Sequence, residues 1–240
     1  MRTKLERRTV LIAYSAVFTA IVFIFTVAFS LYIPETKGFF NIGESGVYLA
    51  ALIGGPIVGA IAGGTGSMLA DIFLGYYWYA PATFLIKAVE GFIAGYLARK
   101  IILKGKYTPR MVGSLASLMG GCSLYTFGTM FYLGGAEIYL QIPFLFSQVL
   151  VVELFSLIWV VLSAMFVITI TYFILRDPGN SGLIISMMVA GIEMVLGYYL
   201  YEQFILGYAA IAEVPFNIMQ MLIGTMVATY VYRGIRAIKG

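Results

Sequence analysis

Residues 9–33 read TVLIAYSAVFTAIVFIFTVAFSLYI, an apolar run that contains no charged side chain and ends just before Pro34. A helix needs about 20 such residues to cross the hydrocarbon core of a bilayer, so this run predicts one crossing. The whole chain has the same character, because 61% of its 240 residues are hydrophobic and 11% are charged. Its long apolar stretches do not alternate with polar residues as the strands of a membrane barrel do. We therefore expect an all-α membrane protein that forms a single membrane domain over residues 1–240.

Eight apolar segments are expected to cross the membrane. They are residues 9–33, 43–63, a short segment up to 75, 81–103, 110–133, 144–175, 183–202 and 207–232. The polar stretch 35–41 and residues 134–143 are expected as outer loops, and the glycine-rich stretch 63–67 as an inner turn. The second segment is rich in glycine and alanine, which let helix backbones approach closely.

Basic residues gather at four places along the chain and give its orientation. They precede the first apolar segment, interrupt the middle between residues 99 and 110, occur at Arg176, and close the chain. Lysine and arginine favour the cytoplasmic side of a membrane, so both termini are expected in the cytoplasm, which fits an even number of crossings. These clusters indicate topology, and no nucleic-acid partner is expected. The N-terminal segment has no small-residue cleavage site and is interpreted as a retained helix.

Residues that the chain lacks exclude several kinds of chemistry. It contains no histidine and one cysteine, Cys122, so histidine-assisted nucleophiles, a zinc-type site and an intrachain disulfide are not expected. The chain has no G-x-x-x-x-G-K-[ST] motif, so it is not expected to hydrolyse a nucleotide through a P-loop. We expect no metal and no cofactor, and transport against a gradient would need ions or a partner protein.

Ionisable side chains inside the predicted crossings are candidates for function, because each costs roughly 2.5 to 3.5 kcal/mol to insert into a membrane. Lys87 and Glu90 are three residues apart and share a helix face. They could neutralise each other within the bundle, or they could contact a ligand. Glu193 has the same two interpretations.

Polar residues of the last segment form a stripe. Glu213, Asn217 and Gln220 follow a spacing of i, i+4 and i+7, which places them on one helix face. Amides donate and accept at once, as recognition of a neutral heterocycle requires, although they also join helices in membranes. Asn41 and Glu44 lie where the first outer loop enters the second segment, and Glu44 could instead be a favourable first-turn carboxylate. We predict that these residues contact a substrate.

Two stretches of the chain are similar to each other. Asp71–Tyr79 and Glu193–Tyr201 share a leucine, a glycine and three tyrosines at matching positions, and each opens with an acid. Same-direction repeats occur in transporters, but tyrosine and glycine are frequent enough here to match by chance. The aromatic run that ends at Tyr79 suits the outer membrane interface or the wall of a pocket.

The first segment carries two alanines, Ala16 and Ala20, four residues apart. Small side chains at this spacing mark close helix contacts, either within one chain or with another protein.

Four stretches together resemble the S component, the substrate-binding membrane subunit of energy-coupling factor (ECF) vitamin transporters. They are Ala16-x-x-x-Ala20 after a basic N-terminus; Phe40–Glu44 with Gly54-Gly55-Pro56; Gly66–Asp71 through Tyr79-Ala80-Pro81 to Lys87–Gly91; and Glu213–Gln220. The resemblance is to the riboflavin, hydroxymethylpyrimidine and pyridoxine branch and covers roughly residues 5–104 and 183–236. Residues 110–175 are absent from the six-helix pattern of that family. We therefore expect a six-helix core plus an inserted pair of helices.

The resemblance implies a function, partners and a location. An S component binds a water-soluble vitamin or vitamin precursor from outside with high affinity. It then associates with a transmembrane coupling protein and two cytoplasmic ATPases, which energise uptake. The expected location is the lipid bilayer of a prokaryotic plasma membrane. In this scheme Ala16 and Ala20 contact the coupling protein, residues 34–41 act as a lid, and the substrate site also includes Tyr79, Lys87, Glu90 and Glu193.

The sequence also allows two other functions. An autonomous secondary transporter could move a small heterocyclic solute with protons that pass through Lys87 and Glu90. An intramembrane enzyme could use Glu153, Glu193 and Asp71 as bases, but no segment carries two acids at a fixed short spacing. No enzymatic activity is therefore expected.

Overall fold

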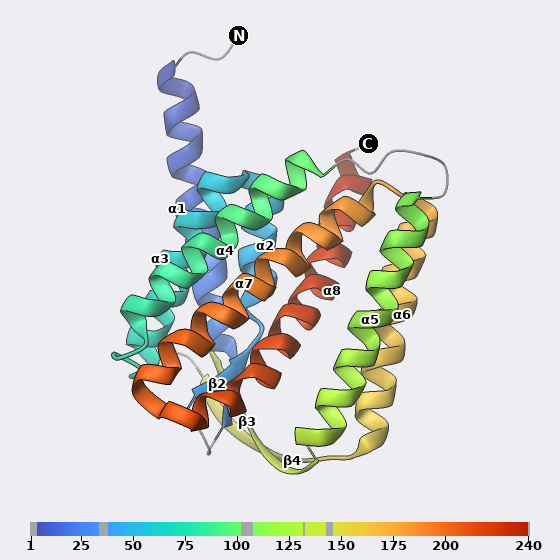
Figure 1. Cartoon of the computed structure of the whole chain (residues 1–240). Coiled ribbons are helices and arrows are strands. Elements are labelled where there is room, and N and C mark those ends of the chain that lie inside the picture. Colours follow the sequence, from blue (N-terminus) through green and yellow to red (C-terminus); the bar gives the residue numbers. More distant parts are fainter. Residues whose placement is uncertain (1–3, 34–37, 102–107, 132, 143–145, 240) are drawn as a thin grey trace.

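The computed structural model describes residues 4–33, 38–101, 108–131, 133–142 and 146–239, and these residues form mostly helices (Figure 1). The helices are α1 (Lys4–Ala28), α2 (Gly43–Gly54), α3 (Pro56–Leu74), α4 (Ala80–Lys100), α5 (Thr108–Phe131), α6 (Ser156–Arg176), α7 (Asn180–Leu206), the 3-10 helix η1 (Gly207–Ala212) and α8 (Glu213–Lys239). Within this part of the chain, six helices are long and apolar enough to cross a membrane: α1, α3, α4, α6, α7 and α8. The prediction of a helical membrane protein is confirmed.

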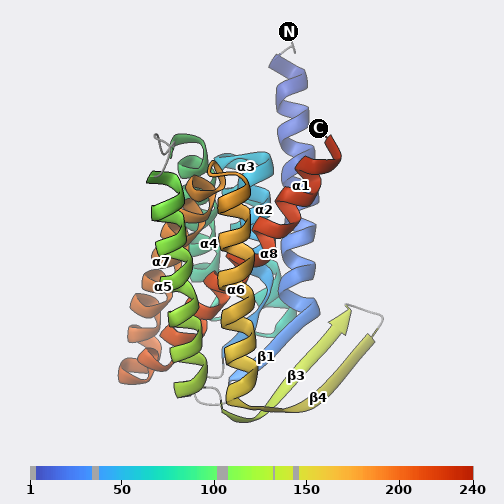
Figure 2. The ribbon, with the colours of Figure 1, turned by 90° about the vertical axis from the view of Figure 1, so that its right-hand side faces the viewer.

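The two ends of the bundle differ in what they carry. The start of α1 and the end of α8 lie at the same end, as do the end of α4, the start of α5 and the junction from α6 to α7 (Figures 1 and 2). The described residues of the four basic clusters fall at these places, among them Arg8, Arg99, Arg110, Arg176 and Arg233. We call this end the basic end. The strands lie at the opposite end, which we call the sheet end.

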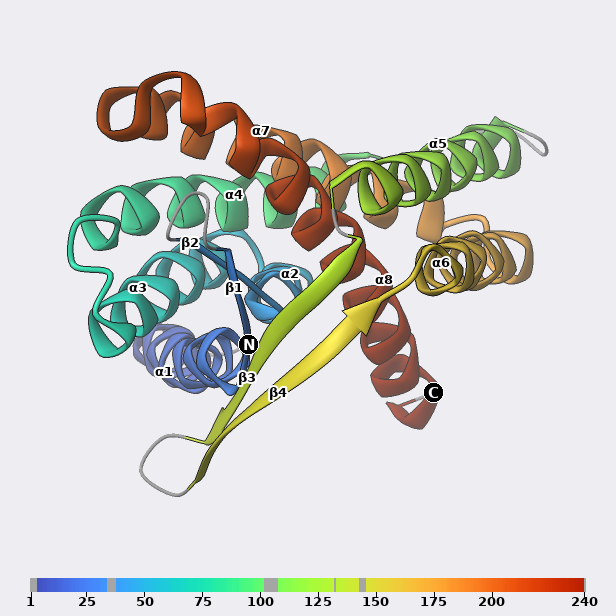
Figure 3. The ribbon, with the colours of Figure 1, turned by 90° about the horizontal axis from the view of Figure 1, so that it is seen from below.

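Six helices pack as one group, and two stand beside it. Helix α3 packs between α1 and α4, α4 also packs against α7, and α2 contacts α1, α3, α4 and α8. Helices α5 and α6 pack chiefly on each other and touch α7 and α8 along one side (Figures 1 and 3). The position of α5 and α6 matches the pair expected from residues 110–175, and whether they are an insertion stays a prediction.

The structure adds a four-stranded antiparallel sheet that the sequence analysis did not predict. It is formed by β1 (Phe29–Ile33), β2 (Gly38–Asn41), β3 (Gly134–Ile142) and β4 (Phe146–Leu154) in the order β2-β1-β3-β4. The expectation of a loop over 134–143 and of one long helix over 144–175 is therefore wrong. The run Val149, Val151 and Val152 favours strand because β-branched side chains suit a pleated surface, and an apolar run of this length has no period that distinguishes strand from helix.

The turn between the second and third segments also differs from the prediction. Helix α2 ends at Gly54, and the chain reverses at Gly55, whose φ of 89° suits glycine. Pro56 then opens α3, as proline does at a first helical position. The stretch 63–67, expected as a turn, lies inside α3. The second predicted segment is therefore the 12-residue helix α2, and the third is the 19-residue helix α3.

The glycines of α3 allow its backbone to approach those of its neighbours. A methyl group added at Gly59 would lie 2.5 Å from the carbonyl oxygen of Gly91 on α4 and 3.0 Å from Cα of Ala51 on α2. One turn later, a methyl group at Gly63 would lie 2.7 Å from the carbonyl oxygen of Lys87. Small residues therefore set the separation of α3 from α4, and this places the backbone of Lys87.

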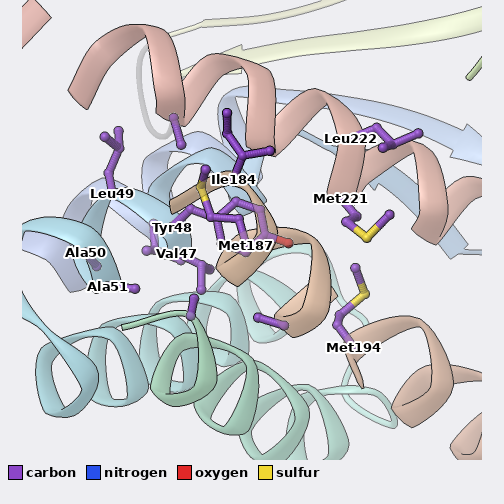
Figure 4. Packing of buried hydrophobic residues seen from close by; sticks show 14 of the residues in the cluster. Val47, Tyr48, Leu49, Ala50, Ala51, Ile184, Met187, Met194, Met221 and Leu222 are labelled. Atoms are coloured by element: carbon purple, nitrogen blue, oxygen red, sulfur yellow. The ribbon is translucent and has the colours of Figure 1, made fainter. Parts of the chain in front are cut away.

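The buried apolar core lies between α2, α7 and α8 in the middle of the bundle (Figure 4). Its fully or almost fully buried members include Val47, Tyr48, Ile184, Met187, Met194, Met221 and Leu222. Tyr48 of this core also donates a hydrogen bond to the buried Glu90.

We predict that Gly59→Ala lowers the thermal stability of the detergent-solubilised protein. The added methyl group must push α3 away from α2 and α4, and overpacking of this kind costs about 1 to 3 kcal/mol. Gly234→Ala on α8 is the control, because a methyl group there would meet nothing within 4 Å. Equal melting temperatures for the two variants would contradict the close approach.

Candidate functional site

A polar cavity lies near the sheet end of the bundle and has a volume of about 50 Å³. A cavity of this size holds a few water molecules, so a larger ligand must displace side chains or the backbone that covers them. Residues from six helices, from β2 and from the turns beside them line it: Thr26, Asn41, Gly43, Glu44, Ser67, Asp71, Tyr76, Tyr79, Thr83, Lys87, Tyr198, Glu202, Glu213, Asn217 and Gln220.

Seven of the nine residues predicted to bind substrate line this cavity. They are Asn41, Glu44, Tyr79, Lys87, Glu213, Asn217 and Gln220. The other two, Glu90 and Glu193, do not line it. Glu90 lies fully buried behind Lys87, and Glu193 is partly exposed on α7. The roles of all nine in binding stay a prediction.

An ion-pair network forms one wall of the cavity. Lys87 on α4 forms ion pairs with Glu44 on α2 and with Glu90, whose Oε2 atom lies 3.1 Å from the lysine Nζ. Tyr48 donates a hydrogen bond of 2.9 Å to Oε1 of Glu90. The Nζ atom also lies 5.5 Å from the ring centre of Tyr198 on α7. Lys87 is therefore held by α2, α4 and α7 at once, and both oxygens of Glu90 are satisfied.

This arrangement bears on the two interpretations of Lys87 and Glu90. The two groups do neutralise each other, as their spacing allows, and Lys87 also reaches the cavity. Glu44 is not simply a first-turn carboxylate, because its side chain forms an ion pair with Lys87 on α4.

The polar stripe on α8 also lines the cavity. Glu213, Asn217 and Gln220 are all buried, with 4%, 5% and 6% of their surface exposed, and all three line the cavity. They lie on one helix face, as their spacing predicts. Asn41 reaches the same cavity from β2, and its Oδ1 atom accepts a hydrogen bond of 2.7 Å from the backbone N–H of Gly43.

Several residues of the cavity were not predicted from the sequence. They are Thr26, Gly43, Ser67, Asp71, Tyr76, Thr83, Tyr198 and Glu202. Asp71 and Glu202 are acids buried to 5% and 2% exposure, so the criterion that selected Glu193 could have selected them. Glu193 and Glu202 are nine residues apart, about two and a half helical turns. They therefore lie on opposite faces of α7, and only one of the two can line this cavity.

The two similar stretches of sequence do not adopt the same structure. Gly75 ends α3 in a left-handed conformation with a φ of 89°, whereas the matching Gly197 lies inside α7. The similarity is therefore not a repeated backbone unit. Even so, the matching tyrosines Tyr76 and Tyr198 both line the cavity.

Known proteins are similar to this chain over part of its length. Residues 7–153 match the family model described as "ECF-type riboflavin transporter, S component". A Pyrococcus woesei protein, named "Uncharacterized protein in gap 3'region", is 36% identical over 93 residues, or 38% of this chain. The aligned region spans 62% of the length of that relative. No solved structure matches the chain.

The extent of the family match does not follow the division predicted from the sequence. It includes α5 and most of the β3–β4 hairpin, and it ends before α6, α7 and α8. The boundaries of the family core at residues 5–104 and 183–236 stay a prediction.

We predict that Lys87→Met strongly destabilises the protein, because it leaves Glu44 and Glu90 buried without their cation. Removing one partner of a buried ion pair typically costs about 3 to 5 kcal/mol. Thermal unfolding in detergent measures this loss. Adding Glu90→Gln to Lys87→Met should restore part of it, and Lys100→Met, at the exposed end of the same helix, should change little. If Lys87→Met were as stable as Lys100→Met, the network would not stabilise the bundle.

Proposed function

The chain belongs to the family of ECF-type riboflavin transporter S components, and from this premise we propose that it is the high-affinity subunit that binds a water-soluble vitamin or vitamin precursor for uptake. Membership makes it a multi-pass transport protein of a prokaryotic plasma membrane and not an enzyme. Which vitamin it binds and how uptake is energised belong to the proposal.

The observation that carries this proposal is the lined cavity within the helical bundle. Polar groups are costly inside a membrane and are retained there for function, yet more than ten polar or charged side chains converge on this one cavity. It lies at the sheet end, opposite the basic end, which the positive-inside rule assigns to the cytoplasm. A ligand would thus enter from outside. The amides of Asn217 and Gln220 supply paired donors and acceptors for a heterocycle.

Energy for uptake would come from partners, since the sequence has no P-loop. We propose a transmembrane coupling protein and two cytoplasmic ATPases. Ala16 and Ala20 suit the contact with the coupling protein, because both are exposed on α1 while Ser15 and Phe18 face inward. Exposed small side chains permit another helix to approach closely.

The segment 34–41 is proposed as a lid over the cavity. Its described part is β2, whose last residue, Asn41, lines the cavity. Residues 34–37 lie outside the described part of the chain. The small volume of the cavity supports a lid, because a vitamin enters only if a covering segment moves.

An ion-driven secondary transporter is the second candidate function, and one observation favours it. The buried Lys87, Glu44 and Glu90 form a cluster of ionisable groups that could pass a proton. Uptake into vesicles that contain this chain alone, abolished by a protonophore, would support this alternative. Uptake that needs ATP and the coupling proteins would exclude it.

We predict that Asn217→Ala and Gln220→Ala each weaken ligand binding by about 1 to 3 kcal/mol, the cost of leaving a buried polar group unpaired. Native mass spectrometry of the purified protein would first identify a bound vitamin, and titration would then give its affinity. Gln203→Ala is the control, since Gln203 lies on α7 and does not line the cavity. Unchanged affinity in both cavity variants, with an intact fold, would remove the two amides from the site.

We predict that Ala16→Leu and Ala20→Leu leave ligand affinity unchanged and abolish uptake, because the larger side chains block the approach of the coupling protein. Uptake is measured in cells that express the whole transporter, and binding is measured on the purified chain. Ala164→Leu, at an exposed alanine of α6, controls for the added bulk. Normal uptake with leucine at both positions would contradict the docking surface.

A further inference from the structure

The charges around the cavity are strongly unbalanced. Among the described residues that line it, four carry a carboxyl group, Glu44, Asp71, Glu202 and Glu213, and Lys87 is the one basic side chain. Lys87 is already paired with Glu44 and with Glu90 behind it. No positive charge of the lining is therefore left for Asp71 and Glu202.

Three of these acids have an oxygen atom that nothing in the described structure satisfies, although in Glu44 the other oxygen pairs with Lys87. Oδ2 of Asp71 and Oε2 of Glu202 are buried without a hydrogen-bond partner, and Asp71 and Glu202 are only 5% and 2% exposed. The hydroxyl of Tyr79, which lines the same cavity, is also buried without a hydrogen-bond partner. Buried polar groups almost always have partners, so four unpartnered polar atoms on one cavity mark a place that a ligand completes.

Three acids of the lining influence the Tyr79 hydroxyl electrostatically. Burial first, and then the carboxyl groups of Glu202, Glu213 and Asp71, raise the pKa of the Tyr79 hydroxyl above its ordinary value. Tyr79 therefore stays neutral and can donate a hydrogen bond. Tyr76, Tyr79 and Tyr198 all line this cavity, and aromatic faces attract organic cations.

A metal ion fits this place poorly. In the described part of the chain, no group of three or more histidine, cysteine, aspartate or glutamate side chains is arranged to hold one. Aromatic rings beside carboxylates are a setting for a charged nitrogen on an organic molecule, where the charge meets the acids and the apolar body meets the rings.

We propose that the cavity selects a cationic ligand, an organic molecule whose positively charged nitrogen lies between the carboxyl groups of Asp71 and Glu202 and against the neighbouring tyrosine rings. This inference rests on the proposed function and narrows it, because it names the charge of the substrate. A ligand without such a nitrogen would leave the two buried carboxyl groups without a partner, which is costly for a charged or a neutral acid. The amides of α8 and the Lys87 network remain for the uncharged part of the molecule.

The test compares vitamins that differ mainly in charge. The purified full-length protein in detergent is titrated with pyridoxamine, which carries an ammonium group, and with pyridoxine, which does not. Thiamine, with its quaternary nitrogen, is compared with its uncharged oxidation product thiochrome, and riboflavin serves as a large uncharged ligand. The wild-type chain should bind at least one cation roughly tenfold or more tightly than its uncharged counterpart.

Two isosteric variants locate the charge. Glu202→Gln and Asp71→Asn keep size and hydrogen-bonding capacity, and glutamine also imitates a protonated carboxyl group. Each should weaken cation binding roughly tenfold or more and leave the uncharged counterpart nearly unaffected. Glu153→Gln, at an exposed acid on β4, is the control and should change neither affinity.

The outcomes separate this inference from the proposed function. Equal or tighter binding of an uncharged vitamin by the wild-type chain overturns the inference and leaves the proposed function in place. A cation preference that survives in both variants overturns the placement at Asp71 and Glu202. Binding of no vitamin of either kind overturns both the inference and the proposed function.

Discussion

The pairing of one buried lysine with two buried carboxylates is the interaction on which the rest of the structure depends. Lys87 joins Glu44 on α2 to Glu90 on α4 and lies beside Tyr198 on α7. Isolated charges are costly inside a bundle, so these helices must stay together for the pairing to hold. Gly63 lets α3 pass close to the backbone of Lys87. The close packing at Gly63 and the ion pairs therefore both determine the position of Lys87.

The parts of the fold that follow from local spacing were predictable from the sequence. The face shared by Lys87 and Glu90 and the stripe on α8 depend only on the helical period, and the structure shows both. The reversal at Gly55 was not predicted because the run 63–67 is also rich in glycine. Whether a glycine forms a turn or allows close packing depends on the backbones beside it. The hairpin was missed because Val149, Val151 and Val152 suit a strand, but their pairing with β3 joins residues distant in sequence.

The candidate site shows the same limit. Glu193 and Glu202 are equally unusual as acids on an apolar helix, and nothing local says which face of α7 meets the cavity. The answer comes from Tyr198, which lies four residues before Glu202 and is held against Thr83 by a hydrogen bond of 3.0 Å. A site assembled from six helices and a strand is set by the rotation of each helix about its axis, and that rotation is a property of the packed whole.

The early end of α2 at Gly54 has a consequence for the path of a bound molecule. Ten residues separate Glu44, on the cavity, from Gly54, a rise of about 15 Å along the helix. The hydrocarbon core of a bilayer is about 30 Å thick. A molecule bound beside Glu44 would therefore lie about half the thickness of the hydrocarbon core away from the level at which α2 ends. Release toward the basic end would therefore follow only about three helical turns of α2.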